Sequence, residues 1–359
     1  MTLDEVIERI TPADEKAERA ARLRQDSLTK PPGSLGRLEA LSIQLAGIFR
    51  TDRPALRGKA TIVAAADHGV VAQGVTSYPR EVTAQMVLNF LAGGAAISVL
   101  ARNAGVELVI VDAGVASPLP DHPDQHVLGI GRGTADMTLG PAMTRDQAEA
   151  CVNAGVLLAQ EAAENGADLI GTGDMGIGNT TASSAIVAAL TRRPPNETTG
   201  RGTGRNDTEL AHKTAVVQRA LEVNRPDSCD GLDVLAKVGG FEIGVLAGVI
   251  LGGALERRAV VLDGFISGAA ALIAHSLCPY VKDYLVASHL SAERGHHAVL
   301  SHLGLAPLLD LEMRLGEGTG AVLAMNLVGP AAACLSEMAT FDEAGVSDKG
   351  PDDAVGLTK

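Results

Sequence analysis

The residues best suited to chemistry lie in three glycine-rich segments, the first of which is Gly171–Thr181 (GTGDMGIGNTT). It carries Asp174, Gly176, Asn179 and Thr180. Glycine lets the backbone come close to a ligand, and the amide groups at a helix start attract an anion. If a helix begins at Asn179, the segment can bind the phosphate of a nucleotide. The alternative is an ordinary tight turn between a strand and a capped helix.

The second segment is Gly200–Arg205 (GRGTGR), which contains Gly202 and precedes Lys213 on a predicted helix. Backbone donors beside two arginines and a lysine suit a phosphate, although a flexible solvated loop explains the pattern equally well.

The third segment is Met313–Gly320 (MRLGEGTG), which contains Arg314, Leu315, Gly316 and Glu317 and leads into an apolar helix. Glycines flank Glu317 on both sides, so its backbone can take unusual conformations. A carboxylate at a helix start is stabilised as the anion, which suits a general base. The alternative is a plain helix-start carboxylate.

Gly171, Gly173 and Gly176 also match the dinucleotide fingerprint G-x-G-x-x-G. That fingerprint needs an acidic residue about twenty positions on, at the end of the next strand. Here Glu197 falls in the Pro- and Gly-rich stretch 192–206, with no strand before it. An NAD-dependent oxidoreductase is therefore a weak alternative.

A mixed apolar and polar wall follows Asp67-His68-Gly69 and includes Tyr78, Gln85 and Met86. Methionine packs well on the edges of aromatic rings, so a flat heteroaromatic ligand could lie there, although a methionine at helical spacing usually belongs to the core. His122 and His126 lack a third ligand, and we expect no metal site.

Short apolar runs must position these segments. Each ends in Gly, Ser, Asp or His and is followed by a helical stretch, which predicts buried parallel strands in an α/β sheet with ligands at their carboxyl ends. Asp263 follows one such run. The runs are Ala60–Ala66, Glu107–Val111, Ala167–Ile170, Ala259–Leu262 and Tyr284–Ala287.

The two ends of the chain have a different pattern. Thr2–Leu28 and Leu35–Phe49 read as helices, and a last long helix covers Thr319–Met338. We predict that residues 1–55 and 316–341 form a small helical domain beside an α/β domain of residues 56–315, with a polar tail at 342–359.

Composition limits the class of protein. The 359 residues are 46% hydrophobic and carry a formal net charge of −13, which disfavours a general nucleic-acid role. The five Phe and three Tyr offer little for base stacking. The apolar runs are short or broken by glycine, so we expect no membrane span. The four cysteines are widely spaced, which favours reduced thiols in the cytoplasm.

Together the motifs resemble the nicotinate-nucleotide–dimethylbenzimidazole phosphoribosyltransferase family of cobalamin synthesis, from about Thr29 to Met338. The matching pieces occur in family order. They are Lys30–Gly36 (KPPGSLG), Ala66–Val70 (ADHGV), Gly173–Thr181 (GDMGIGNTT), Lys237–Phe241 (KVGGF), Leu262–Phe265 (LDGF), Ser288–Glu293 (SHLSAE) and Met313–Gly318 (MRLGEG).

The resemblance implies a Rossmann-like sheet domain, a small domain from both termini and a homodimer. It implies phosphoribosyl transfer from nicotinate mononucleotide to 5,6-dimethylbenzimidazole with inversion at C1′, Glu317 as general base and no cofactor or Mg²⁺. Asp174, a second catalytic candidate, stands where members often have Glu. The remaining implied contacts lie on the two substrates: Gly176, Lys213, Ser291 and Arg314 for the nucleotide, Tyr78, Gln85, Met86 and Leu315 for the benzimidazole, and Asn179, Thr180, Gly202, Asp263 and Gly316 for either.

Two other classes stay open from the residues alone: the oxidoreductase, and a nucleotide-sensing module that binds without turnover. The preferred acceptor base does not transfer from the resemblance, since the wall around Tyr78 and Met86 varies between members.

Overall fold

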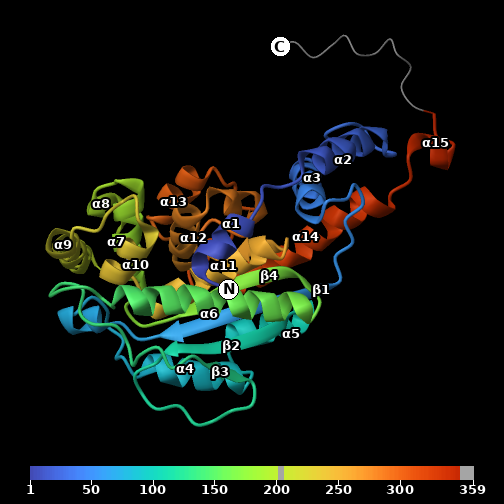
Figure 1. The fold of residues 1–359 in the computed structure, drawn as a ribbon. Coiled ribbons are helices and arrows are strands. Elements are labelled where there is room, and N and C mark those ends of the chain that lie inside the picture. The colour runs from blue at the N-terminus through green and yellow to red at the C-terminus, as the bar shows by residue number, and fades with distance from the viewer. Residues whose placement is uncertain (201–205, 348–359) are drawn as a thin grey trace. The chain divides into compact units, whose positions relative to one another are not determined.

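The computed structural model describes residues 1–200 and 206–347. Its centre is a six-stranded sheet in which every pairing is parallel (Figure 1). The strands are arranged in the order β3-β2-β1-β4-β5-β6, that of a doubly wound nucleotide-binding sheet, so the predicted Rossmann-like fold is confirmed. They are β1 (Gly58–Ala66), β2 (Glu107–Gly114), β3 (Gln125–Val127), β4 (Ala167–Met175), β5 (Ala259–Leu262) and β6 (Leu285–Ala287).

All five predicted runs form strands, but β4 is longer than predicted. It continues to Met175, so Gly171–Asp174 is strand and not loop. Glycine is needed at two of these positions because a side chain on Gly171 would meet Thr61, and one on Gly173 would meet the backbone of Glu317 at 2.5 Å. The three-residue edge strand β3 has no buried residue, and therefore no apolar run predicted it.

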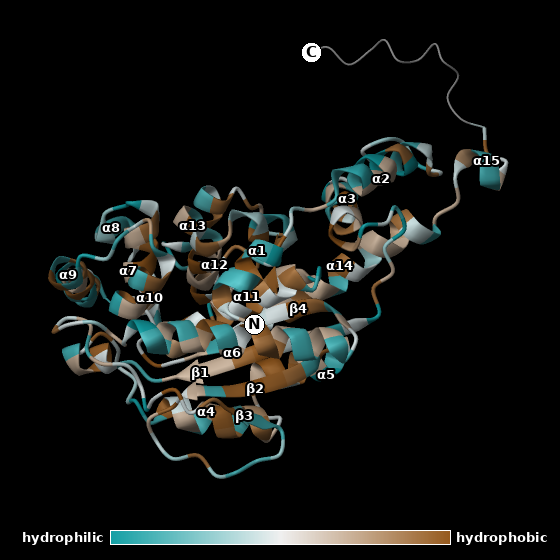
Figure 2. Ribbon diagram, in the orientation of Figure 1, coloured by the Kyte–Doolittle hydropathy of each residue, from teal (hydrophilic) through white to brown (hydrophobic). Residues whose placement is uncertain are grey.

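Helices cover both faces of the sheet. Figure 1 shows α4 (Val82–Leu91) and α5 (Ala96–Ala104) on one face, and α6 (Arg145–Glu164) and α11 (Phe241–Leu255) on the other. Helix α11 is apolar nearly all round and almost wholly buried, and it is brown beside the apolar strands in Figure 2. The other helices of this part are α1 (Leu3–Arg9), α7 (Asn179–Thr191), α8 (Pro195–Thr198), α9 (Asp207–Asn224), α10 (Gly231–Val238), α12 (Phe265–Leu277) and α13 (His296–Leu303), with 3₁₀ turns η1 (Gly69–Gln73) and η2 (Pro279–Tyr284).

The chain forms two compact units, and the first differs from the predicted α/β domain at both ends. It contains Met1–Pro12 together with Arg57–Asn326. The predicted helix Thr2–Leu28 is broken around Pro12, and the Tyr284 hydroxyl donates a 2.7 Å hydrogen bond to the Thr11 carbonyl. The prediction that all of residues 1–55 belong to the small domain was therefore wrong for the first twelve residues.

The second unit contains Ala13–Leu56 and the chain from Leu327 on. It is built from α2 (Glu15–Ser27), α3 (Arg37–Phe49), the end of α14 (Thr319–Glu337) and α15 (Phe341–Ala344). Arg24 bridges its two segments, since its guanidinium donates to the carbonyls of Leu335 and Met338 at 2.7 and 2.9 Å. Helix α14 begins in the first unit, so the predicted boundary at 316 falls about ten residues early.

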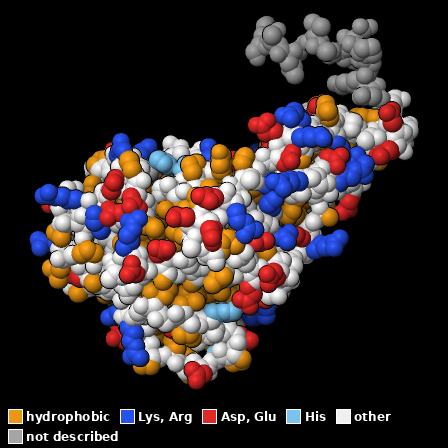
Figure 3. All heavy atoms as spheres, in the orientation of Figure 1, with side chains coloured by type: hydrophobic (Ala, Val, Ile, Leu, Met, Phe, Trp, Pro, Cys, Tyr) orange, Lys and Arg blue, Asp and Glu red, His pale blue; other side chains and the backbone are white. Residues whose placement is uncertain are grey.

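Two apolar stretches, Val82–Ala104 and Thr319–Glu337, pass a test of length and composition for crossing a membrane. The test is weak evidence, because core helices pass it too, and the first stretch is divided into α4 and α5. Charged side chains of both signs are mixed over the face of the molecule in Figure 3. The absence of a membrane role stays a prediction.

Candidate active site

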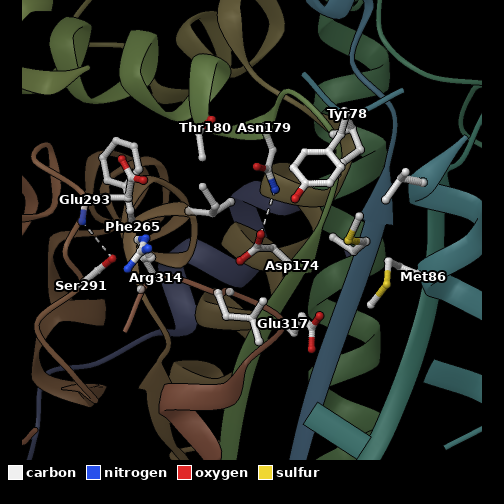
Figure 4. Close-up of a pocket in the computed structure, with 18 of the residues that line it drawn as sticks. Tyr78, Met86, Asp174, Asn179, Thr180, Phe265, Ser291, Glu293, Arg314 and Glu317 are labelled. Carbon is white, nitrogen blue, oxygen red and sulfur yellow. Dashed lines mark hydrogen bonds between the residues drawn. The ribbon is translucent and has the colours of Figure 1, made fainter. Parts of the chain in front are cut away.

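A cavity of about 380 Å³ opens in the first unit beyond the carboxyl ends of β4 and β5 (Figure 4). Predicted residues form much of its wall. Those that line it are Tyr78, Met86, Asp174, Gly176, Asn179, Thr180, Ser291, Arg314, Leu315, Gly316 and Glu317.

Four predicted substrate contacts are not found in the wall. Gln85 is exposed on α4 and is not among the residues that line the cavity, so its contact with the benzimidazole stays a prediction. Lys213 is buried behind the wall, where its Nζ donates a 2.8 Å hydrogen bond to Thr180 Oγ1. Asp263 is also buried, and its carboxylate faces the start of α14 instead of the cavity. Gly202 lies outside the described residues.

The structure adds lining residues that the prediction missed. Some had a signal in the sequence: Gly264, Phe265, His289 and Glu293 stand inside two of the family motifs, and Val82 lies one helical turn before Met86. The full set of additions is Val82, Met175, Ile177, Gly264, Phe265, Ile266, His289 and Glu293.

One end of the cavity is suited to an anion. Helices α7 and α12 both begin there, each after a glycine and without a side-chain cap. Asn179 N and Thr181 N of α7 donate to the carbonyls of Gly176 and Gly178, and the other amide groups of the two first turns can donate to a ligand. Ser291 and the exposed Arg314 lie at the same end (Figure 4). Arginine binds phosphate through paired donors, so the groups at this end of the cavity suit a phosphate.

A buried hydrogen bond between two side chains lies behind the turn before α7. His68 Nε2 lies 2.6 Å from Glu242 Oε1, and a side chain added to Gly176 would meet both. Ile177 N donates to Thr83 Oγ1 at 3.2 Å, which ties the turn to α4. Glycine at position 176 is thus a packing requirement, since a Cβ there would also lie 2.6 Å from the Ala66 carbonyl oxygen.

The opposite end of the cavity is apolar and flat. Tyr78 and Met86 lie there in Figure 4, with Val82 and Leu315 also in the wall. Tyr78 and Leu315 are 49% and 58% exposed, so these large apolar side chains are available to a ligand. Such a wall accepts an aromatic ring.

Glu317 lies between the two ends (Figure 4) and is only 5% exposed. Its Oε2 accepts a 3.3 Å hydrogen bond from Ile97 N, in the first turn of α5. Glu317 does precede a helix, α14, as predicted, but the helix start that its carboxylate faces is that of α5. Burial raises the pKa of Glu317, and the hydrogen bond from Ile97 lowers it in part.

Asp174 lies beside Glu317, with its Oδ2 accepting a 2.8 Å hydrogen bond from Asn179 Nδ2. Burial, with the negative charges of Asp263 and Glu242 next, raises the pKa of Asp174 well above its ordinary value. Burial also raises the pKa of Asp263 to about 7, against the lowering effect of three backbone hydrogen bonds. Burial therefore favours the neutral form of both Asp174 and Glu317, and the rise in pKa is the larger one for Asp174.

No group of three or more His, Cys, Asp or Glu residues in the described part of the chain is arranged to hold a metal ion. The expectation that the reaction needs no metal remains a prediction.

The strand order of the sheet and the cavity at the carboxyl ends of its strands are typical of α/β enzymes that bind nucleotides. The anion-binding end of the cavity and the buried carboxylate of Glu317 fit the same class. A family model described as phosphoribosyltransferase matches residues 10–346. The chain belongs to the nicotinate-nucleotide–dimethylbenzimidazole phosphoribosyltransferase family and is a phosphoribosyltransferase.

Relatives with that name cover nearly the whole chain. One from Roseiflexus sp. is 61% identical over 347 residues, which make up 97% of this chain and 98% of the relative. One from Chloroflexus aggregans is 60% identical with the same two coverages. Two crystal structures from Thermus thermophilus, the first bearing the family's enzyme name and the second described as CobT, are 48% and 50% identical. Their TM-scores are 0.89 and 0.90, and they cover 94% and 93% of this chain and 100% of their own.

Proposed function

We propose that this chain transfers the phosphoribosyl group of nicotinate mononucleotide to 5,6-dimethylbenzimidazole. The products are α-ribazole 5′-phosphate, a precursor of the lower ligand of cobalamin, and nicotinate. The observation that carries the proposal is the position of Glu317, between an anion-binding end and an apolar aromatic wall in one cavity. The names of close relatives support the choice of substrates.

The two ends of the cavity assign the two substrates. The 5′-phosphate lies at the starts of α7 and α12 with Ser291 and Arg314, and the benzimidazole lies against Tyr78 and Met86. The cavity then holds the acceptor nitrogen in line with C1′, on the side opposite the departing pyridine. Such positioning supplies much of the rate enhancement in a reaction of this type.

Glu317 acts as the general base in this proposal. A new bond forms between the benzimidazole nitrogen and C1′ as the bond from C1′ to the pyridinium nitrogen breaks, with inversion at C1′. The electron pair of the broken bond leaves with nicotinate, which departs with a neutral ring nitrogen and needs no acid. The other benzimidazole nitrogen becomes acidic as positive charge develops, and Glu317 accepts its proton.

Asp174 contributes as a neutral acid. Because burial raises its pKa well above the ordinary value, the neutral form of Asp174 is favoured. That form adds no second negative charge beside Glu317 and donates a hydrogen bond to the bound nucleotide. The carboxyl group of Asp174 lies next to Gly316. A Cβ added to Gly316 would lie 3.3 Å from both Asp174 oxygens.

We further propose that the enzyme works in the cytoplasm as a homodimer, without cofactor or metal. All four cysteines are free, which suits a reducing compartment.

The experiment is Glu317→Gln, with Glu312→Gln as its control. Glu312 is exposed on the same segment and does not line the cavity. We expect Glu317→Gln to bind nicotinate mononucleotide normally and to lose about 10²- to 10⁴-fold in kcat, the usual contribution of a general base. Nicotinate release is measured by chromatography. Unchanged turnover would remove Glu317 from the mechanism.

The wild-type protein tests the function itself. No nicotinate from the two substrates would refute the transferase, and hydride transfer to a nicotinamide cofactor would favour the oxidoreductase. Binding of the nucleotide without any turnover would favour the sensing module.

A further inference from the structure

The segment that carries Glu317 has an uncommon backbone. Gly316, Glu317 and Gly318 have φ values of +84°, +63° and +92°, three consecutive left-handed residues. For a non-glycine residue this conformation costs about 1 kcal/mol or more, so the surrounding structure must hold it in place. On the upstream side, Glu317 N donates a 3.2 Å hydrogen bond to the Asp174 carbonyl.

The downstream side is held by the side chain of Asp263, and Thr319 Oγ1 adds a 2.9 Å hydrogen bond to the Gly316 carbonyl. Asp263 Oδ2 accepts a 3.1 Å hydrogen bond from Gly318 N, and Asp263 Oδ1 accepts from Gly320 N and Ala321 N at 2.7 and 3.3 Å. These amides belong to the start of α14, where a side-chain oxygen that accepts their hydrogen bonds stabilises the first turn. Gly320 permits the approach, since a Cβ there would lie 2.9 Å from Asp263 Oδ1.

Asp263 does not contact the cavity. It is 1% exposed, it is absent from the cavity wall, and both of its oxygens accept backbone hydrogen bonds. Its backbone, in contrast, directly precedes Gly264, the residue before α12, whose first turn does line the cavity. Asp263 thus connects two parts of the site: its backbone leads into α12 at the anion-binding end, and its side chain binds the segment that carries Glu317.

We propose that Asp263 is a positioning residue, which fixes the direction of the Glu317 carboxylate through the start of α14 and does not bind substrate. The inference rests on the proposed role of Glu317. It replaces the substrate contact that the sequence predicts for Asp263.

Asp263→Asn tests this role with little change in size. The amide keeps one oxygen for Gly320 and Ala321 and turns an NH₂ group toward Gly318 N, where two donors then face each other. We expect kcat to fall about 10- to 100-fold, the effect of displacing a catalytic group by about 1 Å. The KM and the directly measured Kd for nicotinate mononucleotide stay within about twofold of wild type, since only transition-state interactions are lost.

Asp112→Asn is the matched control. Asp112 Oδ1 also accepts two backbone hydrogen bonds at a strand end, from Gly114 N at 3.0 Å and Val115 N at 2.8 Å. Like Asp263 it does not line the cavity, but its hydrogen bonds do not lead to the segment of Glu317. We expect its kcat and KM to match wild type. An equal loss of kcat in both variants would show a general effect on folding and overturn the specific role.

A double mutant separates positioning from folding. If Asp263 acts only through Glu317, adding Asp263→Asn to Glu317→Gln causes no further loss of kcat, because the two residues work as a unit. Losses that multiply would overturn the proposal. So would a raised KM for the nucleotide with kcat retained, which would restore Asp263 as a substrate contact.

Gly320→Ala keeps the test decisive should Asp263→Asn not fold. It leaves both carboxylates in the chain and places a Cβ against His289 Nδ1, in the cavity wall, and 2.9 Å from Asp263 Oδ1. Combined with Glu317→Gln, it causes no further loss of kcat if it acts through the segment of Glu317, and a further loss if it acts through His289. We expect the same selective loss of kcat, and wild-type kcat would overturn the inference. If Glu317→Gln retains full turnover, the proposed role of Glu317 as the base is refuted. If Glu317→Gln loses turnover but Asp263→Asn keeps the kcat of wild type, only the positioning role of Asp263 is refuted.

Discussion

Asp263 makes the stability of this protein depend on pH in a direction opposite to that of a surface carboxylate. Burial raises its pKa from an ordinary value of 3.8 to about 7. The folded chain therefore binds this proton more tightly than the unfolded chain, and stability increases as pH falls below about 7. At about 1.4 kcal/mol per pH unit, Asp263 adds roughly 2–3 kcal/mol to the free energy of unfolding between pH 8 and pH 5.

His296 opposes this change, so the wild-type curve alone is not decisive. Burial, with the neighbouring His289 and His297 next, lowers its pKa from 6.5 to about 3. The unfolded chain takes up that proton as pH falls below 6.5, and stability drops by roughly 2 kcal/mol by pH 5. The two groups nearly cancel, and only a variant isolates one of them.

The perturbation is Asp263→Asn, measured by thermal unfolding at pH 8 and pH 5. Asparagine does not titrate, and its altered hydrogen bonds contribute equally at both pH values. The stability of the variant relative to wild type is therefore higher at pH 8 than at pH 5 by roughly 2–3 kcal/mol, or a Tm difference of about 5 °C. Asp230→Asn is the control, because Arg145 at 2.7 Å lowers the pKa of that carboxyl group. Its stabilising effect is lost only as pH falls below about 4, so its difference from wild type stays constant over this range.

Equal Tm differences at pH 8 and pH 5 for Asp263→Asn would refute the reasoning. The folded chain would then hold Asp263 ionised at both pH values, and burial would not be its dominant influence.

Three further outcomes are expected. Gly316→Ala lowers kcat by about tenfold, because it forces an alanine to a φ of +84° and places its Cβ 3.3 Å from both Asp174 oxygens. Kinetics like those of wild type would show that the backbone of this segment changes conformation without displacing Glu317. Met86→Ala raises the KM for dimethylbenzimidazole about tenfold without changing the KM for the nucleotide, since it removes part of the apolar wall; a larger change for the nucleotide would reverse the two ends of the cavity. Turnover survives EDTA, as expected where no pyrophosphate leaves, and a loss restored only by added metal would contradict the mechanism.

Much of the fold could be predicted because its strands are continuous apolar runs. Ala259–Leu262 is buried at every position, and its predicted bounds match β5 residue for residue. The edge strand β3 could not be predicted, since a strand at the rim of a sheet needs no apolar run. The break around Pro12 was also missed: charged residues on both sides continue the helical pattern, although proline ends a helix at the residue before it.

The site was predicted from glycine and charge patterns, which mark where a backbone approaches a ligand but not which way a side chain turns. Asp263 shows the difference. Its place after a strand indicates a ligand contact, yet the nearby amides of α14 turn its carboxylate inward. Those amides lie more than fifty residues away in the chain, so only the tertiary structure brings the two together.

The division of charge among three neighbouring carboxyl groups explains why Glu317, and neither aspartate, can serve as the base. Asp263 has both oxygens committed to backbone amides and no access to the cavity. Asp174 does reach the cavity, but burial, with the charges of Asp263 and Glu242 next, raises its pKa well above the ordinary value and favours the neutral form, which does not accept the proton of the acceptor base. Glu317 lines the cavity, and its hydrogen bond from Ile97, at 3.3 Å, is long enough to leave the carboxylate basic. A carboxylate with a raised pKa is a stronger base once it is ionised. Burial of Glu317 lowers the free energy of unfolding when the carboxylate is charged, but it also makes the carboxylate more basic.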